Sequence, residues 1–466
     1  MNPNPINTIL LHPTDILFFR DGRPIKGSLA GHGAAWPLPN VTDAAFHAAL
    51  HRSGLNGHRH DQRVQAERGA KDNRRFGSLV TAGPFPVRKQ GDQGEWFFPM
   101  PHDLLDNVLT PSLMPTLRID SLWSSLPIPL KYPVASGLPP SKDTRAKAWL
   151  SGAAYQRYLD GLNTELRDDE ACNDADFGDA EAMIGIAIVP ETGTTGQSEA
   201  AGKIYSAHYL RLRDDWRLGV FAKTDEKSES GERKDLIGEL LQGHGQMLVG
   251  GQQRLCTATR SEVPRVPLPL GRSYDFVSQE IKTGRTSWLV KWVLLSPAIW
   301  PEIPEHGPDG EPITDRHDRR IQHHPGGWLP NWVRSTDGRV MLRSGERQHR
   351  RYGGKPARGF MDDSTEIPAW LVAAVVPKPI PVTGWALANE TQRLEGGAKS
   401  LHLAVPAGAV YYFEAESPEA AQALANALNW NGGDRNPTGI RNRRSTLMGE
   451  KGFGLGVCGT WAFFGT

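Results

Sequence analysis

The chain has 466 residues, more than one ordinary hydrophobic core accommodates, so its length favours about two domains. Its 53 Lys and Arg residues nearly balance 52 Asp and Glu residues, which excludes a protein drawn as a whole to nucleic acid or to an anionic membrane. No secretory signal opens the sequence and no apolar run approaches the ~20 residues needed to span a bilayer. We therefore expect a soluble, cytoplasmic protein without membrane contact.

Cysteine and histidine patterns give no sign of catalysis or metal binding. The cysteines are far apart and form no CxxC pair, so we expect reduced structural thiols at Cys172, Cys256 and Cys458. Four histidines share one loop, but their spacing fits no zinc site: His306, His317, His323 and His324. No nucleophile elbow or His-Glu-x-x-His motif occurs, so we expect no catalytic residues, metal or cofactor.

Glycine and proline are abundant, at 50 and 36 residues, which indicates long irregular loops on modest cores. Apolar periodicity stops in five segments that we expect to be loops: 52–76, 191–202, 223–234, 303–326 and 336–358. The acidic stretch 165–181 is typical of a solvated surface rather than a metal site.

The N-terminal half shows short strands with two helices. In chain order we expect a strand, a helix, a strand, a further strand or hairpin, a helix and a final strand: 6–11, 41–51, 183–189, 203–222, 236–241 and 246–259. This β-α-β-β-α-β order, with large insertions, is the ferredoxin-like pattern.

A second copy of that pattern follows. We expect its strands at 286–295, 370–376, 410–414 and 457–464, and its helix at 418–429. The predicted fold is therefore α+β, with two ferredoxin-like (RRM-like) units and long inserted loops. A boundary near 272–283 divides the chain into an N-terminal domain, 1–275, and a C-terminal domain, 276–466.

A glycine-rich segment near the C-terminus is the first candidate for chemistry. Its glycines alternate with Lys451 and Phe453 just before the last strand: Gly449, Gly452, Gly454 and Gly456. Glycine lets the backbone approach a ligand closely, and exposed N–H groups can cradle phosphates. No Gly-Lys-Ser/Thr ends the segment, which excludes a nucleotide-hydrolase loop. The alternative is a flexible tight connection.

Basic residues precede this segment. Between 435 and 451 there are five against Glu450 alone: Arg435, Arg441, Arg443, Arg444 and Lys451. Arginine beside a glycine loop suits a polyphosphate backbone. A third basic run, 339–358, fits either an RNA or partner contact or a solvated loop.

The exit from the first strand is the other candidate. It carries two aromatic and three basic residues: Phe18, Phe19, Arg20, Arg23 and Lys26. Arginine binds phosphate with two hydrogen bonds, and an exposed aromatic ring stacks on an unpaired base. The alternatives are a turn pair between Arg20 and Asp21 and two core phenylalanines.

Several segments carry a family resemblance. The glycine-rich ending on two ferredoxin-like units resembles the RAMP superfamily of CRISPR systems. Segments 15–24, 97–105, 294–300 with 327–330, and 405–413 resemble the third subunit of the type III-B Cmr module. Gly250-Gly251-Gln252-Gln253-Arg254 is similar to that family's Gly-Gly-x-x-Arg segment. One departure is that Ile25 and Lys26 stand where the family usually has Phe.

The resemblance implies a non-catalytic subunit of an antiviral, RNA-targeting ribonucleoprotein. It would bind the 5′ repeat-derived tag of CRISPR RNA, with Arg254 among its contacts. Target RNA would be an indirect partner. Its protein partners would be the large polymerase-like subunit and the backbone subunit. We expect the first-strand exit and the C-terminal glycines to converge on that RNA. The alternatives are a metal-independent repeat endoribonuclease using His12 or His32, and a subunit that contacts only proteins.

Overall fold

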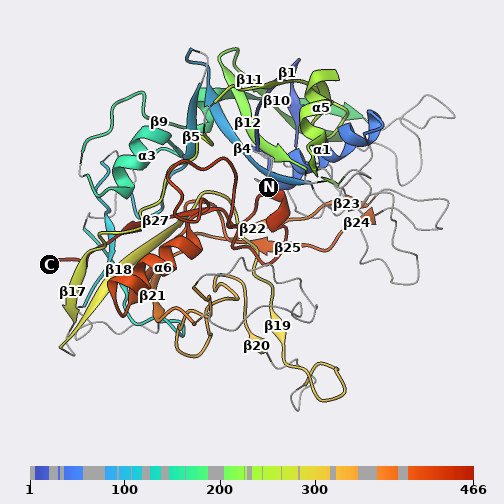
Figure 1. Cartoon of the computed structure of the whole chain (residues 1–466). Coiled ribbons are helices and arrows are strands. Elements are labelled where there is room, and N and C mark those ends of the chain that lie inside the picture. Colours follow the sequence, from blue (N-terminus) through green and yellow to red (C-terminus); the bar gives the residue numbers. More distant parts are fainter. Residues whose placement is uncertain are drawn as a thin grey trace.

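The computed structural model describes residues 6–19, 30–31, 36–55, 79–91, 94–105, 108–117, 126–137, 146–162, 164–186, 204–224, 226–227, 233–243, 245–263, 265–281, 284–314, 322–344, 365–386 and 397–465. Within them the chain forms two large antiparallel sheets, one above the other in Figure 1. No helix in these ranges is long and apolar enough to cross a membrane.

The first large sheet has the strand order β15-β16-β1-β12-β4-β5-β8-β9. Its strands are β1 (Asn7–Pro13), β4 (Val80–Arg88), β5 (Glu95–Pro99), β8 (Trp149–Ser151), β9 (Ala171–Cys172), β12 (Trp216–Lys223), β15 (Gln246–Leu248) and β16 (Leu255–Arg260). Helices α1 (Pro39–Arg52) and α5 (Leu236–Gly243) pack on it through one apolar cluster that includes Ile9, Phe46 and Ile237. Pro39 suits the first turn of α1, where its missing N–H costs nothing.

The second large sheet has the order β17-β18-β26-β21, with β27 also paired to β18. Its strands are β17 (Ser278–Ile281), β18 (Arg285–Leu294), β21 (Ala369–Val375), β26 (Val410–Ala415) and β27 (Gly456–Thr460). Helix α6 (Pro418–Leu428) covers one face (Figure 1). Ser417 begins this helix, because its hydroxyl accepts a hydrogen bond from the Ala420 N–H at 3.1 Å.

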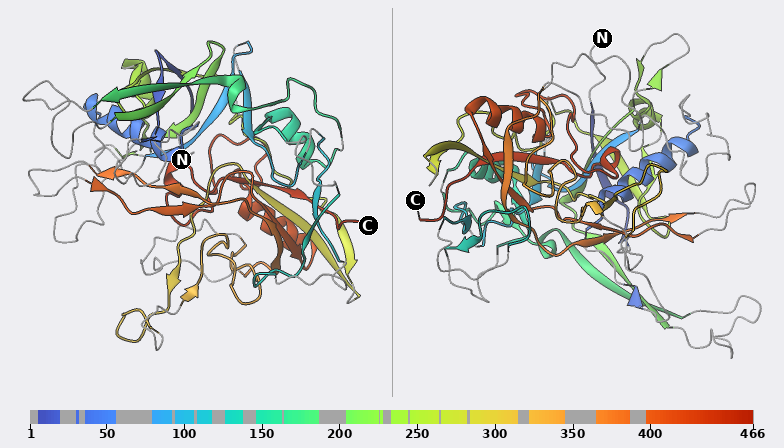
Figure 2. Two further views of the ribbon diagram at one scale, coloured as in Figure 1. Left: turned by 180° about the vertical axis from the view of Figure 1, so that it is seen from behind. Right: turned by 90° about the horizontal axis from the view of Figure 1, so that it is seen from below.

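Smaller elements complete the fold. A long hairpin of β10 (Gly178–Ile186) and β11 (Ile204–Leu212) pairs with β2 (Leu17–Phe18) and β3 (Ala30–Gly31), and it projects from the body (Figure 2). The two-stranded pairs are β6 (Leu113–Pro115) with β7 (Val134–Ser136), β13 (Glu226–Lys227) with β14 (Arg233–Lys234), β19 (Ile303–Pro304) with β20 (Gln322–His324), β22 (Ile380–Val382) with β25 (His402–Ala404), and β23 (Trp385–Ala386) with β24 (Gly397–Ala398). Short helices are α3 (Gly152–Leu159), α4 (Asp174–Phe177) and η3 (Gly449–Lys451).

One hydrophobic cluster spans both large sheets. It contains Phe85 and Phe98 from the first sheet and Val293 and Tyr412 from the second. Burial of this apolar surface holds the sheets together as one body.

Most predicted elements are present. The expected strand 6–11 is β1, the helix 41–51 is α1, and the second copy corresponds to β18, β21, β26, α6 and β27. The mixed, mostly antiparallel architecture is consistent with the expected α+β class. The single strand expected at 246–259 is instead the hairpin β15–β16.

Three further expectations were wrong. Residues 183–186 of the strand predicted at 183–189 form part of β10, but β10 lies outside the first large sheet, where β4 pairs with β12 instead; residues 187–189 lie outside the described residues. The predicted loops 223–234 and 303–326 contain the short strands β13, β14, β19 and β20. The acidic stretch 165–181 is not all solvated surface, because Glu170 is fully buried and accepts two 2.7 Å hydrogen bonds from Arg157.

Candidate nucleic-acid interface

The exit from β1 meets a glycine segment of its own half, an arrangement that we call the N-terminal junction. It comprises Phe18, Phe19 and residues 249–254. The Gly251 N–H donates to the Phe18 carbonyl at 2.9 Å. Gly250 has φ +78°, and a Cβ there would lie 2.6 Å from the same carbonyl oxygen. Only glycine therefore permits this close approach.

Arg254 is the cation of the N-terminal junction. Its guanidinium carbon lies 5.1 Å from the centre of the Tyr209 ring, and its Nη2 donates to Gln252 Oε1 at 3.2 Å. The Tyr209 hydroxyl also donates to Gln252 Oε1, at 2.8 Å. Arg254 Nη1 is 3.9 Å from Asp15, whereas its buried Nε has no hydrogen-bond partner among the described residues.

The turn that presents Arg254 is strained. Gln252 and Gln253 have φ of +56° and +53°, in the left-handed region that side chains other than glycine seldom adopt. Such residues cost on the order of 1–3 kcal/mol each and cluster at binding sites. The packing of Phe18 against Tyr209, with ring centres 5.3 Å apart, helps to hold this turn.

The second half repeats the arrangement. After β18, residues 295–300 meet the segment 443–456, which leads into β27; we call this the C-terminal junction. The Leu295 N–H donates to the Leu455 carbonyl at 2.9 Å, and the Gly454 N–H donates to the Pro297 carbonyl at 2.7 Å. In each half, therefore, the chain that leaves one strand, β1 or β18, is hydrogen-bonded to a glycine segment that comes before another, β16 or β27.

Protein atoms fill the C-terminal glycine segment. A Cβ on Gly452 would lie 2.6 Å from Ala82 Cα, one on Gly454 2.1 Å from the Ser445 nitrogen, and one on Gly456 2.3 Å from Trp292 Nε1. A Cβ on Gly449 would lie at an ordinary contact distance, 3.6 Å, from Arg443 Cβ. The close approach that the glycines predict is thus to other parts of the protein.

Two other predicted residues of this segment are buried. Phe453 is fully buried against Ile299 and Val382. Lys451 is 9% exposed, and its Nζ lies 3.7 Å from Asp43 of α1. Both therefore anchor the segment to the body of the protein.

The three arginines nearest to the glycines have different environments. Arg441 is exposed and donates to Asp434 Oδ2 at 2.8 Å. Arg444 Nε donates to the Ala427 carbonyl at 2.6 Å, which satisfies a carbonyl at the end of α6. Arg443 Nε and Nη2 are buried without a hydrogen-bond partner among the described residues. Burial lowers the pKa of Arg443 to about 10, although nearby Glu450 favours its charge.

The structure describes only part of the first-strand exit. Phe19 is buried in the same hydrophobic cluster as Phe46, so it is a core residue and not part of the interface. Arg20, Arg23 and Lys26 lie outside the described residues. The described contacts pair each glycine segment with the strand exit of its own half, and they do not join the first-strand exit to the C-terminal glycines.

Arg254 and Arg443, the arginines of the two junctions, had only partial signals in the sequence. Arg254 stands out through its resemblance to a family segment, and Arg443 through its basic neighbours. Tyr209 was missed, because it comes from β11 and lies at the junction only through the sheet formed by β11 and β2. Its place in an alternating strand was the only available signal.

Comparison with known proteins identifies the class. A family model described as a CRISPR-associated protein (Cas_Cmr3) matches residues 9–461, so the chain is a CRISPR-associated protein. It belongs to the Cmr3 family, a family of structural subunits of the type III-B Cmr effector complex. No curated protein matches the chain.

Solved structures with a similar chain come from two kinds of assembly. A chain of the type III-B Cmr-beta complex bound to cognate target RNA is 13% identical, with a TM-score of 0.36 and coverage of 87% of this chain and 86% of that one. A chain of the same complex with target RNA and AMPPnP is 14% identical, with a TM-score of 0.35 and coverage of 87% of this chain and 86% of that one. A chain of the Csm1–Csm4 cassette with AMPPNP is 13% identical, with a TM-score of 0.27 and coverage of 70% of this chain and 91% of that one.

Proposed function

We propose that this chain is a non-catalytic subunit that binds the 5′ repeat-derived tag of CRISPR RNA. It would also connect the large polymerase-like subunit to the backbone subunit. Its two halves, 1–275 and 276–466, would each be a ferredoxin-like RAMP unit. The strand orders β16-β1-β12-β4 and β27-β18-β26-β21 support this. When the four strands of each unit are counted in chain order, both orders read 4-1-3-2, with the first strand between the fourth and the third.

One observation carries the RNA proposal: each junction holds an arginine with buried guanidinium nitrogens that lack an acceptor among the described residues. These are Arg254 Nε in the first half and Arg443 Nε and Nη2 in the second. A buried donor attached to a cation is costly without an acceptor. Both arginines are partly exposed as whole residues, so a rotation of the side chain would bring these nitrogens to RNA phosphate oxygens, which are charged, bidentate acceptors for arginine. Arg441, two residues before Arg443, is exposed, and its pair with Asp434 lies at the surface.

Photo-crosslinking tests this assignment. Tag RNA carrying 4-thiouridine would be assembled into the purified complex, irradiated and digested, and crosslinked peptides identified by mass spectrometry. We expect crosslinked peptides from the segments 249–260 and 436–456. Tag crosslinks confined to other subunits would contradict RNA binding and support a subunit that contacts only proteins.

A repeat endoribonuclease is the second candidate, in which the largely exposed His12 of β1 would act as the general base. Desolvation of the covered part of its ring and the nearby charge of Arg217 lower its pKa, which favours the neutral form at neutral pH. His32 lies outside the described residues. Cleavage of a labelled repeat RNA by the pure chain, abolished in His12→Ala, would favour this candidate over a non-catalytic role.

A further inference from the structure

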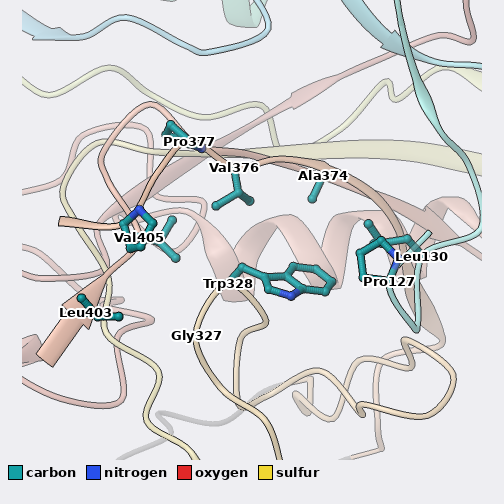
Figure 3. A pocket seen from close by; sticks show the side chains of 10 residues that line it. Pro127, Leu130, Gly327, Trp328, Ala374, Val376, Pro377, Leu403 and Val405 are labelled. Carbon is teal, nitrogen blue, oxygen red and sulfur yellow. The ribbon is translucent and has the colours of Figure 1, made fainter. Parts of the chain in front are cut away.

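An apolar groove of about 400 Å³ lies beside the end of β21, and no residue of either junction lines it. Figure 3 shows Trp328 as its floor, with Leu130 at one end and Val405 at the other. We call it the β21 groove. Exposed apolar side chains lie in the lining and close to it in the chain: Leu403, which lines the groove, is 55% exposed, Leu401 is 49% exposed, and Ile128, next to the lining residue Pro127, is 73% exposed. Exposed apolar surface marks interaction sites where it is extensive.

The walls of the groove are firmly held. The hydroxyl of the buried Tyr411 donates a 2.7 Å hydrogen bond to the Trp328 carbonyl. Val405 exchanges two backbone hydrogen bonds with Ala298, of 2.8 and 3.0 Å. A preformed groove loses little conformational entropy when it binds a ligand.

The groove runs along an open strand edge. The Val372 carbonyl accepts from Lys131 and Tyr132, which covers the first part of the edge of β21. Beyond it, Ala374 pairs only with β26, and neither Ala374 nor Val376 makes a further backbone hydrogen bond to any described residue. An extended chain can add to such an edge through its own backbone groups while its side chains enter the groove.

Charge favours an acidic occupant. Lys131, with a side chain 47% exposed, follows the lining residue Leu130 in the chain, and exposed Lys378 stands between the lining residues Pro377 and Pro379. Lys131 already has one carboxylate 4.0 Å away, that of Glu414, and no Asp or Glu is among the lining residues. RNA fits poorly, because an apolar floor with two lysines gives no continuous cationic track for a phosphate backbone.

We propose that the β21 groove docks an extended apolar segment, flanked by Asp or Glu, from another protein subunit of the Cmr complex. This inference rests on the bridging part of the proposed function and not on RNA binding. Leu, Val or Ile side chains of the segment would contact Trp328 and Leu403, and its carboxylates would lie near Lys378.

Peptide binding to the full chain tests the proposal. Fluorescein-labelled peptides of about 15 residues, tiling the other subunits of the same complex, would be titrated by fluorescence anisotropy. We expect binding by peptides with an apolar centre and acidic flanks. Leu403→Lys should raise their Kd about tenfold, and Lys378→Glu about threefold, because each removes a complementary contact. Ile184→Lys, at a 77% exposed position on β10, is the matched control and should leave Kd unchanged.

Three outcomes would overturn the proposal: no tiled peptide binds, bound peptides are insensitive to Leu403→Lys, or single-stranded RNA competes with them for the groove. Failure here is distinguishable from failure of the proposed function. Tag-RNA affinity measured with the same proteins depends on Arg254 and Arg443, and it should be the same in Leu403→Lys and in the wild-type protein.

Discussion

Lys291 of β18 and Asp103, which follows β5, form a buried ion pair that joins the two large sheets. Lys291 Nζ lies 3.2 Å from Asp103 Oδ2, and the two side chains are 3% and 1% exposed. The Tyr158 hydroxyl is 2.8 Å from both carboxylate oxygens, and its ring centre is 3.7 Å from Lys291 Nζ. Each buried charge thus has a partner on the opposite side of the interface between the sheets.

Removing one member of this pair should be strongly destabilising. Lys291→Met leaves the Asp103 carboxylate buried without its cation, which typically costs about 3–5 kcal/mol of unfolding free energy. Urea unfolding followed by tryptophan fluorescence measures the loss. Arg334→Met, at the exposed pair with Asp337, is the control and should cost about 1 kcal/mol or less. Equal effects of the two substitutions would contradict a special role for the buried pair.

The stability of the protein should fall in acid partly because of Glu170. Hydrogen bonds from Arg157 lower the pKa of this buried carboxyl from 4.5 to about 2. A folded-state pKa below the unfolded value stabilises the protein above about pH 4.5, and this stabilisation is lost as pH falls toward 2.

Glu170→Gln removes that titration. Its unfolding free energy should be lower than wild type at neutral pH, and it should decline less steeply between about pH 5 and pH 3. Denaturant midpoints across this range measure both effects. Parallel curves for the two proteins would show that Glu170 does not contribute to the acid sensitivity.

The cysteines should be unreactive in the folded protein. All three are buried, and burial raises the pKa of Cys172 and of Cys256 to about 12 and raises the pKa of Cys458 well above the usual value of a thiol. Thiolate is the reactive form, so iodoacetamide near pH 8 should leave them unmodified until the chain unfolds. Intact-mass spectrometry before and after denaturation gives the result. Rapid alkylation of native protein would contradict the packing around these thiols.

Gly452 should be intolerant of a side chain. Its φ is +94° and its position against Ala82 leaves no room for Cβ, so Gly452→Ala should cost on the order of 2 kcal/mol or more. Gly439→Ala is the matched control, since a Cβ there meets nothing within 4 Å and Gly439 has no positive φ. Thermal unfolding compares the two. A Gly452→Ala protein as stable as Gly439→Ala would mean that the segment is not held against β4.

Local patterns revealed many elements, whereas tertiary neighbours decided the site. Alternating apolar residues or helical spacing identified β1, α1, β18 and α6, because those signals lie within each segment. β4 was missed because Gly83, Pro84 and Pro86 interrupt it, and proline normally argues against an internal strand. Its Pro84 and Pro86 are accommodated in a strand whose pairing with β12 is irregular near Gly219.

The C-terminal glycines show the same limit at the site. Their spacing predicts close backbone approach, but whether a ligand or the protein approaches depends on residues far away in the sequence. Ala82 lies against Gly452, and Asp43 pairs with Lys451. Composition likewise shows five basic residues without revealing that Arg444 binds a helix carbonyl while Arg443 has buried nitrogens without acceptors.

The most direct test of the account is the salt dependence of tag-RNA binding by the complex reconstituted with an Arg254→Gln, Arg443→Gln double variant. Two lost phosphate contacts should weaken binding at least tenfold and reduce the slope of log K against log salt by about 1.4, at about 0.7 per contact on a single strand. Arg334→Gln serves as the control for one exposed charge, and unchanged thermal unfolding verifies that the double variant is folded. Only the double variant should show this loss; wild-type affinity and slope in the double variant would mean that Arg254 and Arg443 do not bind the tag.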